Sequence, residues 1–140
     1  MRAHRGRPGP TVLIAGDASD LRDLRALIST LPADAYGQVY VEVTDAAQVE
    51  RLAKPPRVAV TWLVREGEDG STTDPGVLLS AAVDGWIAEW MPAGARDDRR
   101  IAWVGCAAVP RIADRYRVLQ ERSMTAAAMG LPTVEVDEAE

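Results

Sequence analysis

The stretch Thr11-Val12-Leu13-Ile14-Ala15-Gly16-Asp17-Ala18-Ser19-Asp20 decides the fold of this chain. Residues 11–15 form a continuous apolar run, which is typical of a central parallel strand that is covered on both faces. After the glycine, apolar residues recur at helical spacing until Pro32 ends the helix, and Asp17 or Ser19 can cap its start. In an open α/β sheet such a strand-to-helix turn lies at the carboxyl edge, where ligands bind. We therefore expect a binding site to have its floor at this turn.

Further along the chain, strand-like and helix-like segments alternate. After a turn at Tyr36-Gly37, strands are predicted over residues 38–43, 57–63, 101–105 and 132–136. A short helical turn is predicted within residues 44–49, and a longer helix begins with Asp74 as its N-cap and Pro75 at its first position. A last helix begins at Pro110 and extends toward Gly130. This order predicts an α/β fold of three layers (α/β/α), Rossmann-like, with an open, mostly parallel five-stranded sheet.

The composition indicates one globular domain. The chain has 140 residues, of which 47% are hydrophobic and 26% are charged, and this length allows one well-packed core. We expect residues 1–10 to form a flexible leader, residues 11–136 the domain, and residues 137–140 an acidic tail. The net charge of −5 argues against a nucleic-acid partner. Because no apolar run is long enough to span a membrane, we expect no membrane association and a cytoplasmic location.

Candidate site residues come from the three turns that follow predicted strands. They are Gly16, Asp17 and Ala18 after the first strand, Thr61, Trp62 and Arg65 around the end of the third, and Gly105 and Cys106 after the fourth. The first turn carries neither a G-x-G-x-x-G nor a Walker pattern, so the usual phosphate-binding motifs are absent. Two roles are open for Asp17: it only caps a helix, or it also binds a ribose hydroxyl. Trp62 and Arg65 either stack on an adenine and bind a phosphate, or are a core residue and a solvated cation.

The sequence predicts neither a catalytic nucleophile nor a metal centre. Cys106 is the sole cysteine and has no paired histidine to activate its thiol. His4 is the sole histidine and lies in the predicted leader, so neither a Ser-His-Asp arrangement nor a histidine-based metal site is expected.

Taken together, several of these segments resemble the nicotinamide-binding domain of siderophore-interacting proteins. The resemblance covers roughly residues 11–120 and rests on residues 11–37, Val41-Glu42-Val43, Val60-Thr61-Trp62-Leu63-Val64-Arg65 and Ile101-Ala102-Trp103-Val104-Gly105. Members of that family are flavin-dependent ferric-siderophore reductases related to the ferredoxin-NADP reductase group. In them NADPH delivers a hydride to the flavin, which then reduces the iron of a ferric siderophore.

The resemblance implies that NADPH or NADH binds at the carboxyl edge of the sheet. It places the cofactor beside Gly16, Asp17 and Ala18, with the Thr61, Trp62 and Arg65 group and the Gly105 and Cys106 pair at the neighbouring strand ends. Within this set, Arg65 is the candidate for a phosphate contact.

Three features differ from the family's pattern. Where the family usually has Trp-x-Ala-Gly-Glu, this chain has Trp103-Val104-Gly105-Cys106-Ala107, and the family's closing Gly-Tyr-Trp segment is missing. A flavin-binding β-barrel precedes the domain in the family, whereas a leader of ten residues precedes Thr11 here, so we expect no FAD to bind this chain alone. Two hypotheses follow. The chain is a stand-alone nicotinamide-nucleotide-binding half that works with a separate flavin-binding protein, or it is a cofactor-free relative that acts through protein contacts, for example as a homodimer.

Overall fold

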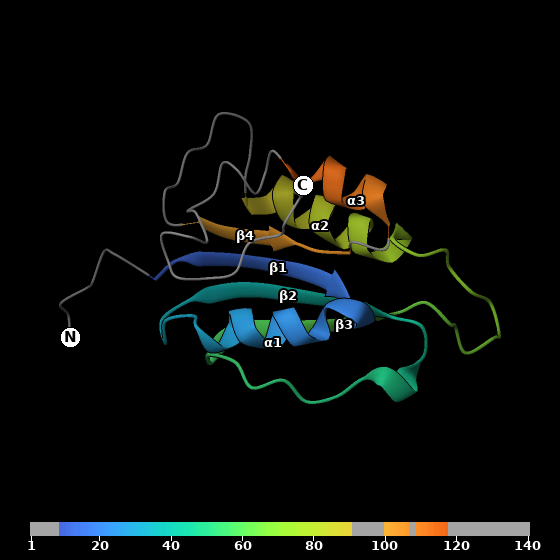
Figure 1. The fold of residues 1–140 in the computed structure, drawn as a ribbon, viewed down its shortest axis with the longest axis horizontal. Helices are drawn as coiled ribbons and strands as arrows, with labels where there is room; N and C mark the ends of the chain where they lie inside the picture. The colour runs from blue at the N-terminus through green and yellow to red at the C-terminus, as the bar shows by residue number, and fades with distance from the viewer. Residues whose placement is uncertain (1–8, 91–99, 107–108, 118–140) are drawn as a thin grey trace, which may run out of the picture.

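A parallel sheet forms the centre of the molecule, which we describe from a computed structural model for residues 9–90, 100–106 and 109–117. The strands β1 (Thr11–Asp17), β2 (Tyr36–Val43), β3 (Arg57–Val64) and β4 (Arg100–Val104) lie in the order β3-β2-β1-β4 (Figure 1). The helices are α1 (Leu21–Ser29), α2 (Val77–Trp90) and α3 (Pro110–Arg115), and the 3₁₀ turns are η1 (Ala18–Asp20) and η2 (Ala46–Gln48). All three strand pairings are parallel, so the predicted α/β class is confirmed.

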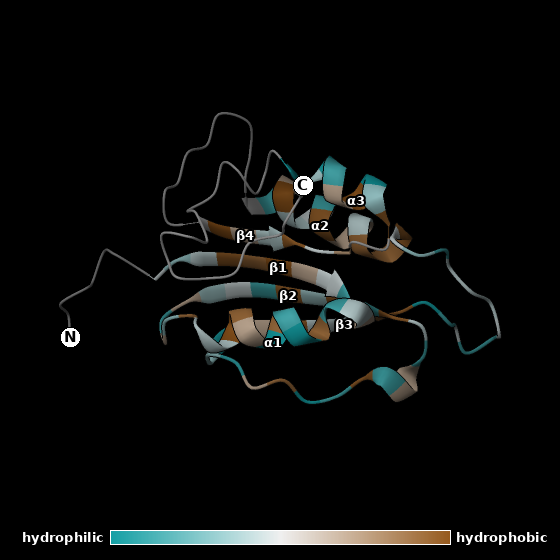
Figure 2. Cartoon of the chain, viewed as in Figure 1, coloured by the Kyte–Doolittle hydropathy of each residue, from teal (hydrophilic) through white to brown (hydrophobic). Residues whose placement is uncertain are grey.

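The helices cover both faces of this sheet, and β1 supplies side chains to both. Val12 and Ile14 pack on the side of α1, against Leu24, Leu27 and Ile28. The intervening Leu13 and Ala15 pack on the opposite side, where α2, α3 and the C-cap of α3 contribute Leu79, Val83, Trp86, Ile112 and Tyr116. In Figures 1 and 2, α1 lies on one side of the sheet and α2 and α3 on the other, with apolar residues concentrated along β1. Because successive side chains of a strand point to opposite faces, an unbroken apolar run can fill two cores.

This strand order places a topological switch point between β1 and β4. The chain leaves β1 through α1 to reach β2 on one side, and reaches β4 through α2 on the other side. The connections therefore diverge at the carboxyl ends of these two strands, which is where open α/β sheets bind ligands. The first candidate turn, Asp17-Ala18-Ser19, lies at this position.

The start of β2 differs from the prediction. Tyr36 and Gly37 pair with Thr11 and Val12 of β1, so they belong to the strand and do not form a turn. Gly37 has φ +146°, and a Cβ built there would lie 2.1 Å from the carbonyl oxygen of Val12. The glycine that suggested a turn is therefore required by the close approach of two strands.

The start of α2 also differs from the prediction. The helix begins at Val77, and the predicted N-cap Asp74 and first-turn Pro75 precede it in a turn that places Gly76 at φ +90°. The carboxylate of Glu42, from β2, accepts hydrogen bonds from the N–H groups of Gly76 (2.8 Å) and Leu79 (3.1 Å). The start of α2 is thus capped by a residue of β2, which is distant in the sequence, so the sequence around the helix start could not reveal this cap.

Several predicted segments lie outside the described residues. They are the leader up to residue 8, the continuation of the last helix to Gly130, the strand at 132–136 and the acidic tail at 137–140. The described part of the sheet has four strands, and the fifth stays a prediction. Within the described ranges, no helix is both long enough and apolar enough to cross a lipid bilayer.

Candidate functional site

The turn after β1 is held by its own polar side chains. Asp17 caps η1, because its Oδ1 accepts hydrogen bonds from the backbone N–H (3.0 Å) and the hydroxyl (2.5 Å) of Ser19. The predicted capping role of Asp17 is therefore confirmed. Its second carboxylate oxygen, Oδ2, accepts a hydrogen bond from the thiol of Cys106 at 3.4 Å. The carboxylate is half-buried, so it occupies the floor of the carboxyl edge without being removed from solvent.

The buried carboxylate of Asp20 lies next to this turn, at the switch point between β1 and β4. Oδ2 of Asp20 accepts hydrogen bonds from the backbone N–H groups of Asp17 (2.9 Å) and Cys106 (2.7 Å), so one side chain joins the ends of β1 and β4. Burial raises the pKa of Asp20 to about 6, and the neighbouring charge of Asp17 acts in the same direction. Gly16 and Gly105 make room for it, because a Cβ at either position would lie within 3 Å of the Asp20 side chain.

The environment of Cys106 makes it a poor nucleophile. The residue is fully buried and adopts a positive φ of 62°. Burial first, and then the negative charge of Asp17, raise the pKa of its thiol above the ordinary range. The raised pKa favours the protonated thiol, which donates to Oδ2 of Asp17.

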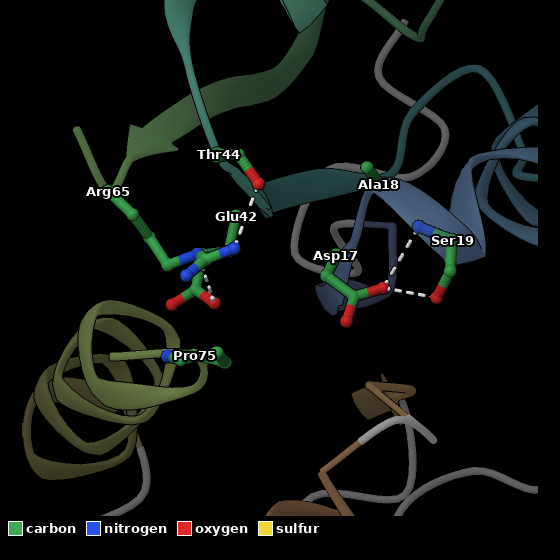
Figure 3. Close-up of a pocket in the computed structure, with 7 residues that line it drawn as sticks. All are labelled: Asp17, Ala18, Ser19, Glu42, Thr44, Arg65 and Pro75. Carbon is green, nitrogen blue, oxygen red and sulfur yellow. Dashed lines mark hydrogen bonds and ion pairs between the residues drawn. The ribbon is translucent and has the colours of Figure 1, made fainter. Parts of the chain in front are cut away.

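The opposite wall of the site is built from Glu42, Thr44 and Arg65, which come from β2 and the segment after β3. Glu42 is only 2% exposed, although it is a charged residue. Arg65 donates to the hydroxyl of Thr44 (2.8 Å) and to the carbonyl of Thr73 (3.3 Å), and its Nε lies 3.8 Å from Oε1 of Glu42. In Figure 3 the guanidinium of Arg65 lies between Thr44 and the carboxylate of Glu42, on the side of Pro75 in the turn before α2.

Two adjoining cavities open between these walls. The smaller, of about 160 Å³, is lined by Asp17, Ala18, Ser19, Glu42, Thr44, Arg65 and Pro75 (Figure 3). The larger, of about 470 Å³, is lined by Asp17, Arg65, Asp74, Pro75, Val109 and Arg111. Asp17, Arg65 and Pro75 belong to both linings, so the two cavities form one site at the carboxyl edge. The larger volume lies in the range of pockets that hold small molecules.

The structure brings only some of the predicted site residues to this edge. Asp17, Ala18 and Arg65 line the cavities. Gly16, Gly105 and Cys106 lie behind the floor and support it. Thr61 is exposed, and its hydroxyl lies 3.4 Å from Oε1 of Gln38, while the half-buried Trp62 packs against the core on the α1 side. Neither of these last two residues is among the described residues that line the site.

Sequence reasoning missed other residues of the site. The missed residues are Glu42 and Arg111, which line the cavities, and Asp20, which bonds to the residues behind them. Only Glu42 could have been noticed in the sequence, because it is a charged residue between two valines at the end of a β-rich segment. Arg111 comes from α3, whose approach to the carboxyl ends of β1 and β3 depends on the tertiary fold. Among the described residues, no group of three or more histidines, cysteines or carboxylates could hold a metal ion.

Comparison with known proteins shows the family. The family model described as siderophore-interacting protein matches residues 10–131. The ferric vibriobactin reductase ViuB of Vibrio cholerae serotype O1 is 30% identical over 67 residues, which cover 44% of this chain and 25% of ViuB. The same match is found in two strains of that species. The chain thus spans a quarter of this curated relative.

Solved structures show the same fold. A siderophore utilization protein from T. fusca aligns with a TM-score of 0.55 and 24% identity, covering 81% of this chain and 41% of that chain. The siderophore-interacting protein from Acinetobacter baumannii aligns with a TM-score of 0.50 and 14% identity, covering 84% and 43%. The family model spans most of the sequence, and the resemblance seen in the sequence is confirmed. This chain belongs to the siderophore-interacting protein family.

Proposed function

We propose that this chain is the nicotinamide-nucleotide-binding half of a ferric-siderophore reductase system, and that a flavin-binding partner supplies the flavin. The observation that carries the proposal is the cavity of about 470 Å³ at the β1–β4 switch point, with Asp17 on its floor and two arginines in its lining. Dinucleotides bind at such switch points. The similarity to ViuB, a ferric vibriobactin reductase, supports the same class of system.

The residues at this edge fit part of a nucleotide. The half-buried Asp17 has its carboxylate at the cavity, where it can accept hydrogen bonds from ribose hydroxyls. Ala18 offers a small side chain next to it, which leaves room for a sugar, and the guanidinium of Arg65 closes the opposite wall. A bound NADPH or NADH would supply the hydride for reduction of a flavin. The role of this chain's own residues is to bind and orient the nucleotide.

A specific observation favours a second function. The N–H groups at the start of α2 are bonded to Glu42, and the start of η1 is capped by Asp17, so the chain's own carboxylates occupy positions at which phosphates often bind. A relative with filled anion positions could have lost the cofactor and act through protein contacts. The two functions differ in one measurable property, which is affinity for a nicotinamide nucleotide.

Titration calorimetry and thermal unfolding with NADPH, NADH and FAD separate the two functions. We expect NADPH or NADH to bind and to raise the unfolding temperature, because a ligand that binds only the folded state stabilises it. FAD should give no such shift with this chain alone. If neither nicotinamide nucleotide produced heat or a shift at millimolar concentration, the nucleotide-binding function would be excluded, and the protein-contact function would be favoured.

A further inference from the structure

The larger cavity has two arginines in its lining, and their surroundings differ. Arg65 is engaged by Thr44, Thr73 and Glu42, and Figure 3 shows its guanidinium directed at Glu42 and Thr44. Glu42 is buried, and its carboxylate is also bonded to the start of α2. A phosphate bound to Arg65 would therefore compete with the ion pair between Arg65 and Glu42 and with the hydrogen bonds from Arg65 to Thr44 and Thr73.

Arg111 is free of such partners. It is exposed on α3, and its side chain forms no hydrogen bond or ion pair with the residues that the structure describes. The next arginines along the same segment are both paired, Arg115 with Asp84 at 2.8 Å and Arg117 with Asp114. Arg111 is thus the arginine of this helix that faces the cavity with its donors unused.

The carboxylates around the cavity limit the kind of ligand that can bind beside Arg111. Asp17 and Asp74 line the same space, so a purely anionic ligand would meet two negative charges as well as the guanidinium. A ligand with phosphate at one end and hydroxyl groups at the other suits this arrangement better, because a carboxylate accepts hydrogen bonds from hydroxyls and a guanidinium binds phosphate through two parallel donors. A nucleotide has both kinds of group.

We propose that Arg111, and not Arg65, binds the phosphate of the nucleotide ligand, while Arg65 holds Glu42 and the start of α2 in place. This inference rests on the proposed function, since it assigns a residue to that same site. It moves the phosphate contact from Arg65, the candidate that the family resemblance suggested, to the side of the cavity formed by α3.

Titration calorimetry on the whole chain tests the assignment, with NADPH and NADH as probes and adenosine as a probe without phosphate. We expect Arg111→Ala to weaken binding of both dinucleotides about tenfold, which is the size expected for loss of a charge-assisted contact. Adenosine binding should not change. Arg111→Lys should fall between the parent and the alanine variant, because lysine keeps the charge but loses the two-donor geometry.

Arg117→Ala is the matched control, because it removes an arginine of the same segment that is paired with Asp114 and is not among the cavity-lining residues. It should bind all three probes like the parent. Equal dinucleotide affinity of Arg111→Ala and the parent would overturn the inference and leave the proposed function standing. An equal loss of adenosine and dinucleotide binding would also overturn it. A parent that binds neither dinucleotide would overturn the proposed function and this inference together.

Discussion

At the scale of single residues, two buried carboxylates organise the carboxyl edge. Glu42 caps α2 and pairs with Arg65, and Asp20 joins the ends of β1 and β4. Asp17 was predicted correctly as a cap from its position before the helix. The roles of Glu42 and Asp20 could not be predicted, because their partners lie on elements that are distant in the sequence.

We predict that Glu42→Ala lowers the free energy of unfolding by about 2 to 3 kcal/mol, because it leaves two N–H groups of α2 without an acceptor and Arg65 without its counter-charge. Urea unfolding checks this value. Glu50→Ala is the control, since the pair between Glu50 and Arg25 is exposed and such pairs contribute about 0 to 1 kcal/mol. Equal effects of the two substitutions would contradict the capping role.

Asp20 should give the stability a specific pH dependence. Its pKa is raised from 3.8 to about 6 by burial, so between these pH values the folded chain binds more protons at this site than the unfolded chain. The stability that Asp20 contributes is present below pH 3.8 and is lost as pH rises through about 6. The free energy of unfolding of the parent minus that of Asp20→Asn should therefore decrease from pH 4 to pH 6. Urea unfolding of both proteins measures the difference, and a pH-independent difference would contradict the assignment.

At the scale of elements, β1, β3, β4 and the start of α3 were predictable because they depend on local patterns. The apolar run of β1, the β-rich run of β3 and the proline that opens α3 all appear in the structure where the sequence indicates. The predictions failed at Tyr36-Gly37 and at Asp74-Pro75, where turn-forming residues serve a tertiary contact. Gly37 allows two strands to approach, and the turn at Pro75-Gly76 brings α2 to Glu42.

Two glycine substitutions should have opposite effects on stability. Gly37→Ala should lower the free energy of unfolding by more than about 2 kcal/mol, because its Cβ would collide with the Val12 carbonyl in a backbone conformation that disfavours alanine. Gly85→Ala should raise it by about 0.5 to 1 kcal/mol, since this glycine lies inside α2 and its Cβ would meet no atom within 4 Å. Thermal unfolding of both variants checks the prediction, and a stabilising Gly37→Ala would refute the close approach.

At the scale of the whole molecule, the strand order determines where a ligand can bind. The order β3-β2-β1-β4 creates the switch point, and the cavities lie at the carboxyl edge beside it. The sequence was sufficient to predict the fold class and the family. It was not sufficient to separate Asp17, Ala18 and Arg65, which line the site, from Thr61 and Trp62, which do not. Thr61 and Trp62 lie within β3, before its carboxyl end, whereas Arg65 follows that end and lines both cavities.

A titration of the ¹⁵N-labelled chain with NADPH, followed by amide chemical shifts, tests whether a nicotinamide nucleotide binds at this edge. We predict that the largest shift changes fall on Asp17, Ala18 and Ser19 and on Val109 and Arg111, with Thr61 and Trp62 little affected. An absence of shift changes at millimolar NADPH, or changes centred on Thr61 and Trp62 in β3, would contradict binding of the nucleotide at this edge.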